Sequence, residues 1–139
     1  MKIILLVLLL VSLADAKFIR SGYVVVDSSS SLEWQDNTTP VKKSWKGAID
    51  YCENLSLGGK NDWRLPNINE LLSIVDDSKY NPAINSSFIN FTSSYYWSST
   101  TIANNSSHAW NIDFNYGTVS HYYYKKTNKF YVRCVRAGQ

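Results

Sequence analysis

The sequence holds few of the residues from which most enzymes and metal sites are built. It has only two histidines, His108 and His121, and only two cysteines. It contains no nucleophile elbow, no His-Glu-x-x-His motif and no Cys-x-x-Cys motif. We therefore expect a protein that is not an enzyme and that binds no cofactor and no metal. An enzyme built on isolated carboxylates such as Asp113 and Glu33 is the alternative that the sequence leaves open.

Charge of either sign is also scarce. Charged residues make up 18% of the chain, and the formal net charge at pH 7 is +3. Nucleic-acid-binding domains are typically more strongly basic than this. We therefore expect no nucleic-acid partner.

Long apolar runs are absent beyond the N-terminus. The one such run covers residues 3–11, follows Lys2, and leads into Ala14-Asp15-Ala16. This pattern is typical of a secretory signal peptide, and the run is too short for a stable membrane anchor. We expect a signal peptide over residues 1–16 and a single domain over residues 17–139, a length that suits one hydrophobic core. The protein is then exported, and either periplasmic or secreted to the cell surface.

The two cysteines, Cys52 and Cys134, are expected to form one disulfide. Paired cysteines are the default in an exported protein, because the compartment is oxidising. The closed loop would span most of the domain, for which the chain-entropy estimate is ~4–5 kcal/mol. Two free buried thiols are the alternative.

Aromatic residues are abundant, with ten tyrosines and five tryptophans. Such side chains can fill a core or form an exposed binding surface, and composition alone does not choose between the two.

Two amphipathic helices are predicted in the first half of the domain. The first begins at Ser44 as its N-cap and ends at Gly58-Gly59. The second follows Pro66 and is capped by Asn67. The apolar stripes that indicate them are Trp45, Ala48, Ile49, Cys52 and Leu55 in the first helix and Ile68, Leu71, Leu72 and Val75 in the second.

Strands are predicted on both sides of the helices. The first two strands are predicted over residues 22–27 and 32–34, on either side of a serine turn. After the helices, a polar stretch between residues 76 and 94 is expected to cover Phe88 and Phe91. From Tyr95 onward the apolar period changes to two. Together these patterns predict an α+β fold with two helices and a mostly antiparallel sheet. The later strands are predicted over residues 95–100, 108–114, 118–125 and 130–136.

Several segments, in order and covering nearly the whole domain, resemble the Lcl C-terminal-domain family, which is named for Legionella collagen-like protein and was formerly a domain of unknown function. They are LEWQD (32–36), WKGAIDYCENLSLGGKNDWRLPNINELLSIVD (45–76), YWSST (96–100), AWNIDFNYG (109–117) and YVRCVR (131–136).

The resemblance implies a variant of the C-type-lectin fold, in which a disulfide joins the first helix to the last strand. Cys52 and Cys134 fall on those elements. The member that names the family is a surface adhesin whose domain binds sulfated glycosaminoglycans as a trimer, so the resemblance implies acidic-glycan binding and makes an oligomer possible. This chain contains no Gly-X-Y collagen tract.

Calcium-dependent sugar binding is not predicted. The lectin signatures Glu-Pro-Asn, Gln-Pro-Asp and Trp-Asn-Asp are all absent. Asp76, Asp77 and Asn81 could gather oxygens around an ion, but we interpret the two aspartates as solvated residues at a helix end.

Lysine and tyrosine side chains are the candidate ligand-binding residues. Lysines can hold the sulfate or carboxylate groups of a polyanion, and tyrosine faces can stack on sugar rings. The alternative is an ordinary solvated rim that protects strand edges. The candidates are Lys42, Lys43, Lys125, Lys126, Lys129, Tyr122 and Tyr124, with Lys46 nearby on the first helix.

The segment NDWRLPNINE, residues 61–70, is interpreted as structural. Trp63 anchors the entry to the second helix and Pro66 stiffens it. Arg64 has acidic neighbours in Asp62 and Glu70, so it is expected to form either an internal salt bridge or contacts with backbone carbonyls.

Two functions follow from these features. The first is an exported, non-enzymatic binding module that recognises acidic glycans or a cell-surface partner. The second is a periplasmic or envelope protein-interaction domain, such as an inhibitor or assembly factor, without glycan binding.

Overall fold

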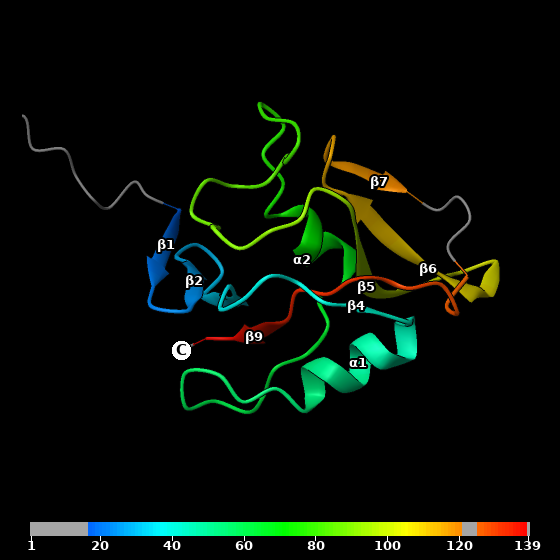
Figure 1. Ribbon diagram of the computed structural model, residues 1–139, viewed down its shortest axis with the longest axis horizontal. Coiled ribbons are helices and arrows are strands. Elements are labelled where there is room, and N and C mark those ends of the chain that lie inside the picture. Colours follow the sequence, from blue (N-terminus) through cyan, green and yellow to red (C-terminus); the bar gives the residue numbers. More distant parts are fainter. Residues whose placement is uncertain (1–16, 121–124, 139) are drawn as a thin grey trace, which may run out of the picture.

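The computed structural model describes residues 17–120 and 125–138, and over these ranges the chain is an α+β protein with two sheets and two short helices (Figure 1). The four-stranded sheet has the order β1-β2-β3-β9, and the five-stranded sheet has the order β4-β8-β5-β6-β7. The first sheet consists of β1 (Phe18–Ser21), β2 (Val24–Asp27), β3 (Leu32–Gln35) and β9 (Val135–Ala137). The second consists of β4 (Lys42–Lys43), β5 (Tyr95–Ile102), β6 (Asn105–Asp113), β7 (Thr118–Ser120) and β8 (Phe130–Tyr131).

The N-terminal hairpin predicted from the sequence is confirmed. β2 and β3 pair antiparallel, with Val25 opposite Trp34, and both side chains are fully buried. These two residues are buried because the alternating pattern of each strand turns them to the same face.

The last predicted strand, residues 130–136, is wrong as a single element. β8 and β9 belong to different sheets, and residues 132–134 carry the chain from one sheet to the other. The break occurs where the Arg133 guanidinium enters the interior to reach Asp36. β8 also pairs in parallel with β5, the one parallel pairing within the described ranges.

The first helix, α1 (Trp45–Glu53), begins as predicted and ends earlier than predicted. The Ser44 hydroxyl accepts a hydrogen bond from the Gly47 N–H, which is the expected N-cap. The helix ends before Asn54, whose amide donates to the carbonyl of Asp50. Gly58-Gly59 does not stop the helix. Both glycines have positive φ, +62° and +73°, and form a separate tight turn further along.

The second helix, α2 (Ile68–Leu72), also begins as predicted. Asn67 accepts from the Glu70 N–H, and the Glu70 carboxylate accepts from the Asn67 N–H, which together form a capping box. The apolar stripe predicts a helix reaching Val75, but the helix ends at Leu72. Val75 instead forms an isolated β-bridge with Ile84.

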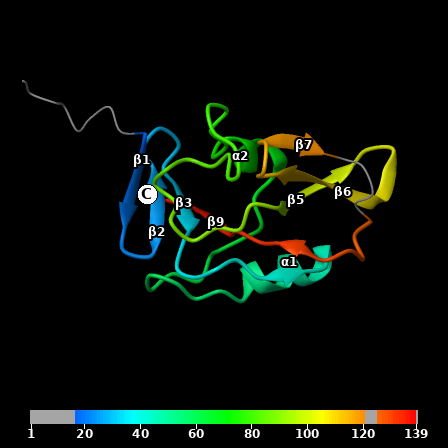
Figure 2. The ribbon, with the colours of Figure 1, turned by 45° about the horizontal axis from the view of Figure 1, so that its top comes forward.

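Figure 2 shows α1 and α2 on opposite sides of the layer that contains β5 and β9. Two hydrophobic clusters fill the two sides. One surrounds Trp34, Tyr96 and Phe114, and the other surrounds Trp97. The predicted disulfide is confirmed within the second cluster. Cys52 in α1 and Cys134 are both fully buried, with their Cα atoms 5.5 Å apart.

One packing expectation fails in the loop before β5. Phe88 is buried as predicted, at 2% exposure, whereas Phe91 is 40% exposed. Phe91 is turned outward because its neighbour Asn90 bonds inward through its backbone and its amide to Asp36.

Candidate functional site

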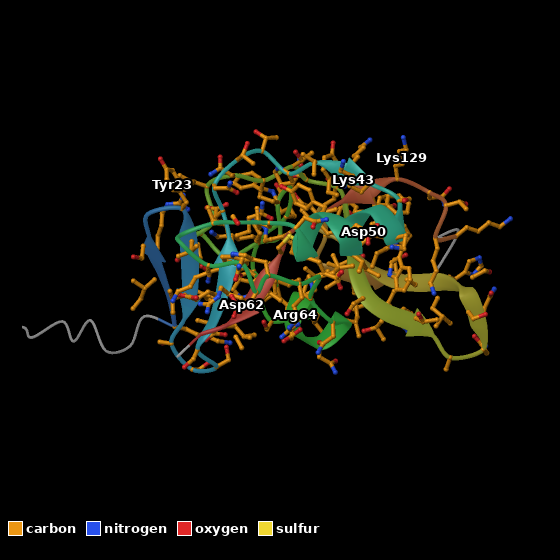
Figure 3. All side chains as sticks on the ribbon, turned by 90° about the horizontal axis from the view of Figure 1, so that it is seen from below. Tyr23, Lys43, Asp50, Asp62, Arg64 and Lys129 are labelled. Carbon is orange, nitrogen blue, oxygen red and sulfur yellow. A yellow bond between two sulfur atoms is a disulfide. The ribbon has the colours of Figure 1, made fainter. Side chains whose placement is uncertain are left out.

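Two lysine clusters that are far apart in the sequence approach each other where β4, an edge strand of the five-stranded sheet, pairs with β8. β4 pairs antiparallel with β8, so that Lys43 lies opposite Phe130, the residue after Lys129. Figure 3 shows Lys43 and Lys129 near each other on the same side of the molecule. We call this set the lysine edge, and it consists of Lys42, Lys43, Lys125, Lys126 and Lys129.

The turn before β8 is held in place by its backbone. Lys125 forms an isolated β-bridge with His108 of β6. The Lys126 N–H donates to the Ser107 carbonyl at 2.9 Å, and the Lys126 carbonyl accepts from the Trp45 N–H at 3.0 Å. The turn is therefore fixed to both the β5–β6 hairpin and the start of α1.

Four of the five lysines are exposed, and only Lys126 is partly buried. Lys42 and Lys43 are successive strand residues, so their stems leave opposite faces of β4. The Lys42 ammonium lies 5.2 Å from the centroid of the Tyr131 ring, and the Lys43 ammonium lies 6.0 Å from that of Tyr51. The edge strand thus carries an ammonium group on each face.

The Lys126 side chain has a different environment. Its ammonium lies 3.8 Å from the centroid of the Trp45 ring and donates to the Thr101 hydroxyl at 3.0 Å. The Trp45 ring is itself fixed, because its Nε1–H donates to the Ser98 carbonyl at 2.9 Å. Lys126 is therefore held against the protein.

Arginines and lysines have different partners in this protein. Every arginine forms an ion pair with a carboxylate, whereas no ion pair joins the five lysines of the edge to a carboxylate within the described ranges. Within the described ranges, the lysines of the edge therefore carry positive charge that has no carboxylate partner, whereas each arginine has one. The arginine pairs are Arg20–Asp36, Arg64–Glu70, Arg133–Asp36, Arg136–Glu33 and Arg136–Asp62.

The segment around Arg64 is built into the fold. Trp63 and Pro66 are buried, and the Arg64 backbone pairs with Val135 through hydrogen bonds of 2.8 and 2.9 Å. The Arg64 guanidinium donates to both oxygens of Glu70 at 2.7 Å. These hydrogen bonds hold the pKa of the Glu70 carboxyl below its usual value. Of the two partners expected for Arg64, Glu70 is therefore the one present.

The other expected partner, Asp62, pairs with a different arginine. It accepts from Arg136 at 2.6 and 3.2 Å, and Arg136 also pairs with Glu33 of β3. Asp62 thus ties the loop before α2 to β9.

A buried charge network surrounds Asp36, the residue that follows β3. The sequence pattern did not reveal this network. Asp36 is fully buried and pairs with Arg133 at 3.0 Å and with Arg20. The same carboxylate accepts from the N–H groups of Ile89 at 2.9 Å and Asn90 at 3.1 Å. Because Ile89 and Asn90 both donate backbone N–H groups to Asp36 at the end of β3, this network fixes the loop before β5 to the sheet.

The segments that form these contacts are also those that a known family shares. Residues 23–136 match the Lcl C-terminal domain. The chain belongs to the Lcl C-terminal domain family. No curated protein matches the chain.

Two predicted site residues of this Lcl C-terminal domain, Tyr122 and Tyr124, lie outside the described residues. Lys46 lies beside the lysine edge, but it is paired with Asp50 at 2.7 Å. That hydrogen bond raises the pKa of the Lys46 ammonium.

Asp76 of the Lcl C-terminal domain follows α2, and its carboxylate accepts hydrogen bonds from a residue of its own turn. Its Oδ1 accepts from the Ser78 N–H at 3.0 Å and from the Ser78 hydroxyl at 2.6 Å. These bonds lower the pKa of the Asp76 carboxyl.

In the described part of the chain, no three histidine, cysteine or acidic side chains gather as a metal site would need. No helix in that part is long and apolar enough to cross a membrane.

Proposed function

We propose that this protein is an exported, non-enzymatic binding module whose lysine edge holds an acidic glycan. One observation carries the proposal. The β4–β8 pairing gathers lysines from two distant segments, and no described carboxylate is paired with them, although every arginine forms an ion pair within the fold.

The chemistry favours a polymer that carries many negative charges. A single exposed lysine binds one sulfate or carboxylate weakly, because water and salt screen the charge. Several ammonium groups on one rigid edge can meet successive charges of one chain at the same time. Each contact then releases bound counterions, and the individual gains act together.

Family membership supports the same direction. The adhesin that names the family binds sulfated glycosaminoglycans, and we propose a C-type-lectin-like arrangement for this domain as well. The disulfide between α1 and the segment leading into β9 is consistent with that arrangement.

Heparin affinity chromatography tests the proposal against simple edge protection by lysine. The test variant replaces Lys43, Lys125 and Lys129 by glutamine. The matched control replaces Lys17, Lys60 and Lys79, which are exposed lysines elsewhere on the surface, so that both variants lose the same charge. We expect the control to elute close to the wild type and the test variant to elute at clearly lower salt. Equal elution of the two variants, or no retention of the wild type, contradicts the proposal.

A second candidate function is a protein-interaction domain of the envelope, and an exposed apolar group favours it. Tyr23, Ile89 and Phe91 are 67%, 63% and 40% exposed. The Tyr23 carbonyl accepts from the Asp36 N–H at 2.9 Å and the Ile89 N–H donates to the Asp36 carboxylate, so both residues adjoin the same buried group. Contiguous exposed apolar residues commonly mark interaction sites.

A pull-down from envelope extracts separates the two functions. The bait variants replace Tyr23 and Ile89 by serine, or Lys43, Lys125 and Lys129 by glutamine. A specific partner retained by the lysine variant and lost by the serine variant would favour the interaction domain. A partner lost by the lysine variant alone would favour the lysine edge.

A further inference from the structure

We propose that Lys126 is a positioning residue of the lysine edge and not one of its ligand contacts. Its ammonium, held between the Trp45 ring and the Thr101 hydroxyl, fixes the turn that presents Lys125 and Lys129. The inference rests on the proposed function, because the ligand that this turn meets is the polyanion named there.

The contacts of Lys126 distinguish it from its neighbours. An ammonium group has three N–H donors and no acceptor. One donor of Lys126 is used by Thr101, and the group also lies over the indole face at 3.8 Å. An indole face attracts a cation through its quadrupole. A ligand would have to displace this cation from both partners in order to bind it directly.

The platform beneath Lys126 is itself rigid. The Trp45 indole is oriented by its bond to the Ser98 carbonyl in β5, and Thr101 also lies in β5. The Lys126 backbone bonds to Ser107 on one side and to Trp45 on the other. Side chain and backbone thus fix the turn to the same two elements, the β5–β6 hairpin and α1.

Fixing the turn lowers the cost of binding. A surface turn that is free to move must be ordered when a ligand contacts it, and that ordering reduces affinity. With Lys126 in place, Lys125 and Lys129 are presented in one arrangement before the ligand arrives. Removing the Lys126 ammonium should therefore weaken binding without removing a ligand contact.

Salt dependence separates a positioning lysine from a contact lysine. The affinity of the mature domain for a heparin oligosaccharide is measured by isothermal titration over a range of NaCl concentrations. For Lys129→Gln, we expect the plot of log K against log[salt] to become less steep, by roughly the contribution that one charge contact makes to the slope. For Lys126→Met, we expect roughly 3- to 10-fold weaker binding with the wild-type slope. Lys126→Arg keeps a cation over Trp45 and should restore most of the affinity.

A second readout does not depend on the ligand. Amide hydrogen exchange at Lys126 and Asn128 should be faster in Lys126→Met than in the wild type or in Lys129→Gln, at an unchanged global melting temperature. A wild type that fails to bind heparin overturns the proposed function, whereas unchanged exchange in Lys126→Met overturns the positioning role. A decreased salt slope in Lys126→Met, or wild-type affinity in that variant, also overturns it.

Discussion

Replacing Asp36 by asparagine should strongly destabilise the fold, because Asp36 is the central acceptor of a buried network. Its carboxylate pairs with Arg133 and Arg20 and accepts from the N–H groups of Ile89 and Asn90. Asparagine is nearly the same size, but it has no charge and only one acceptor oxygen. Its NH₂ group would face donors that now meet an oxygen.

The magnitude follows from the burial of the partners. Asp36 is fully buried and Arg133 is 2% exposed. Removing one member of a buried ion pair costs ~3–5 kcal/mol, because the other charge is left without a partner. A domain of this size is stable by roughly 5–15 kcal/mol. The substitution should therefore remove at least about a fifth of the free energy of unfolding, and far more if the domain is only marginally stable.

Urea denaturation followed by tryptophan fluorescence measures this effect. With a denaturant slope of about 1.5–2 kcal/mol per molar urea, the midpoint should fall by roughly 1.5–3 M. Asp50→Asn is the matched control, because it removes a carboxylate whose pair with Lys46 is exposed. We expect its midpoint to stay within experimental error of the wild type. A midpoint for Asp36→Asn as close to the wild type as that of the control would refute the argument.

Other contacts give smaller or independent predictions. Replacing Cys52 and Cys134 together by alanine should lower the free energy of unfolding by ~4–5 kcal/mol, because the disulfide closes a loop with a sequence separation of 82 residues; a melting temperature unchanged by this pair of substitutions would contradict it. Arg64→Ala should lower the melting temperature by only a few degrees, because Arg64 is 45% exposed and its ion pair is partly screened. The folded pKa of Glu70 lies below its ordinary value of 4.5, so its contribution is complete above about that pH and is lost as the pH falls through the folded pKa. Glu70→Gln should therefore lose less stability than the wild type between pH 5 and 3 in the same urea assay, and parallel losses would count against this assignment.

The parts of the fold that depend on local chemistry could be predicted from the sequence. Ser44 and Asn67 are N-caps because their side chains bond to N–H groups three residues on, and that spacing is visible in the chain. The serine turn between β2 and β3 is equally local. The disulfide could be predicted because only one pairing of two cysteines exists.

Features that depend on distant partners could not be predicted in the same way. The strand over residues 130–136 breaks because Arg133 bonds to Asp36, 97 residues earlier. The end of α1 is set by Asn54, whose amide bond to Asp50 has no periodic signature. A signal for the network did exist, since Asp36 and Arg133 are charged residues next to apolar strands.

The candidate site was predicted only as two separate clusters. The strands that join them, β4 and β8, have two residues each, and such short strands show no alternation. The Lys126 ammonium is held in place by tertiary contacts with Trp45 and Thr101, which the sequence does not show. Sequence alone therefore grouped Lys126 with the exposed lysines.

Whether the lysine edge is the ligand-binding surface can be tested most directly by NMR. Amide spectra of the ¹⁵N-labelled domain, residues 17–139, are followed during titration with a heparin oligosaccharide, and then with its desulfated form. We predict saturable shifts confined to residues 42–46 and 125–130 with the sulfated oligosaccharide, and none with the desulfated one. Shifts centred on Tyr23 and Ile89, or no saturable shifts at all, would contradict the account.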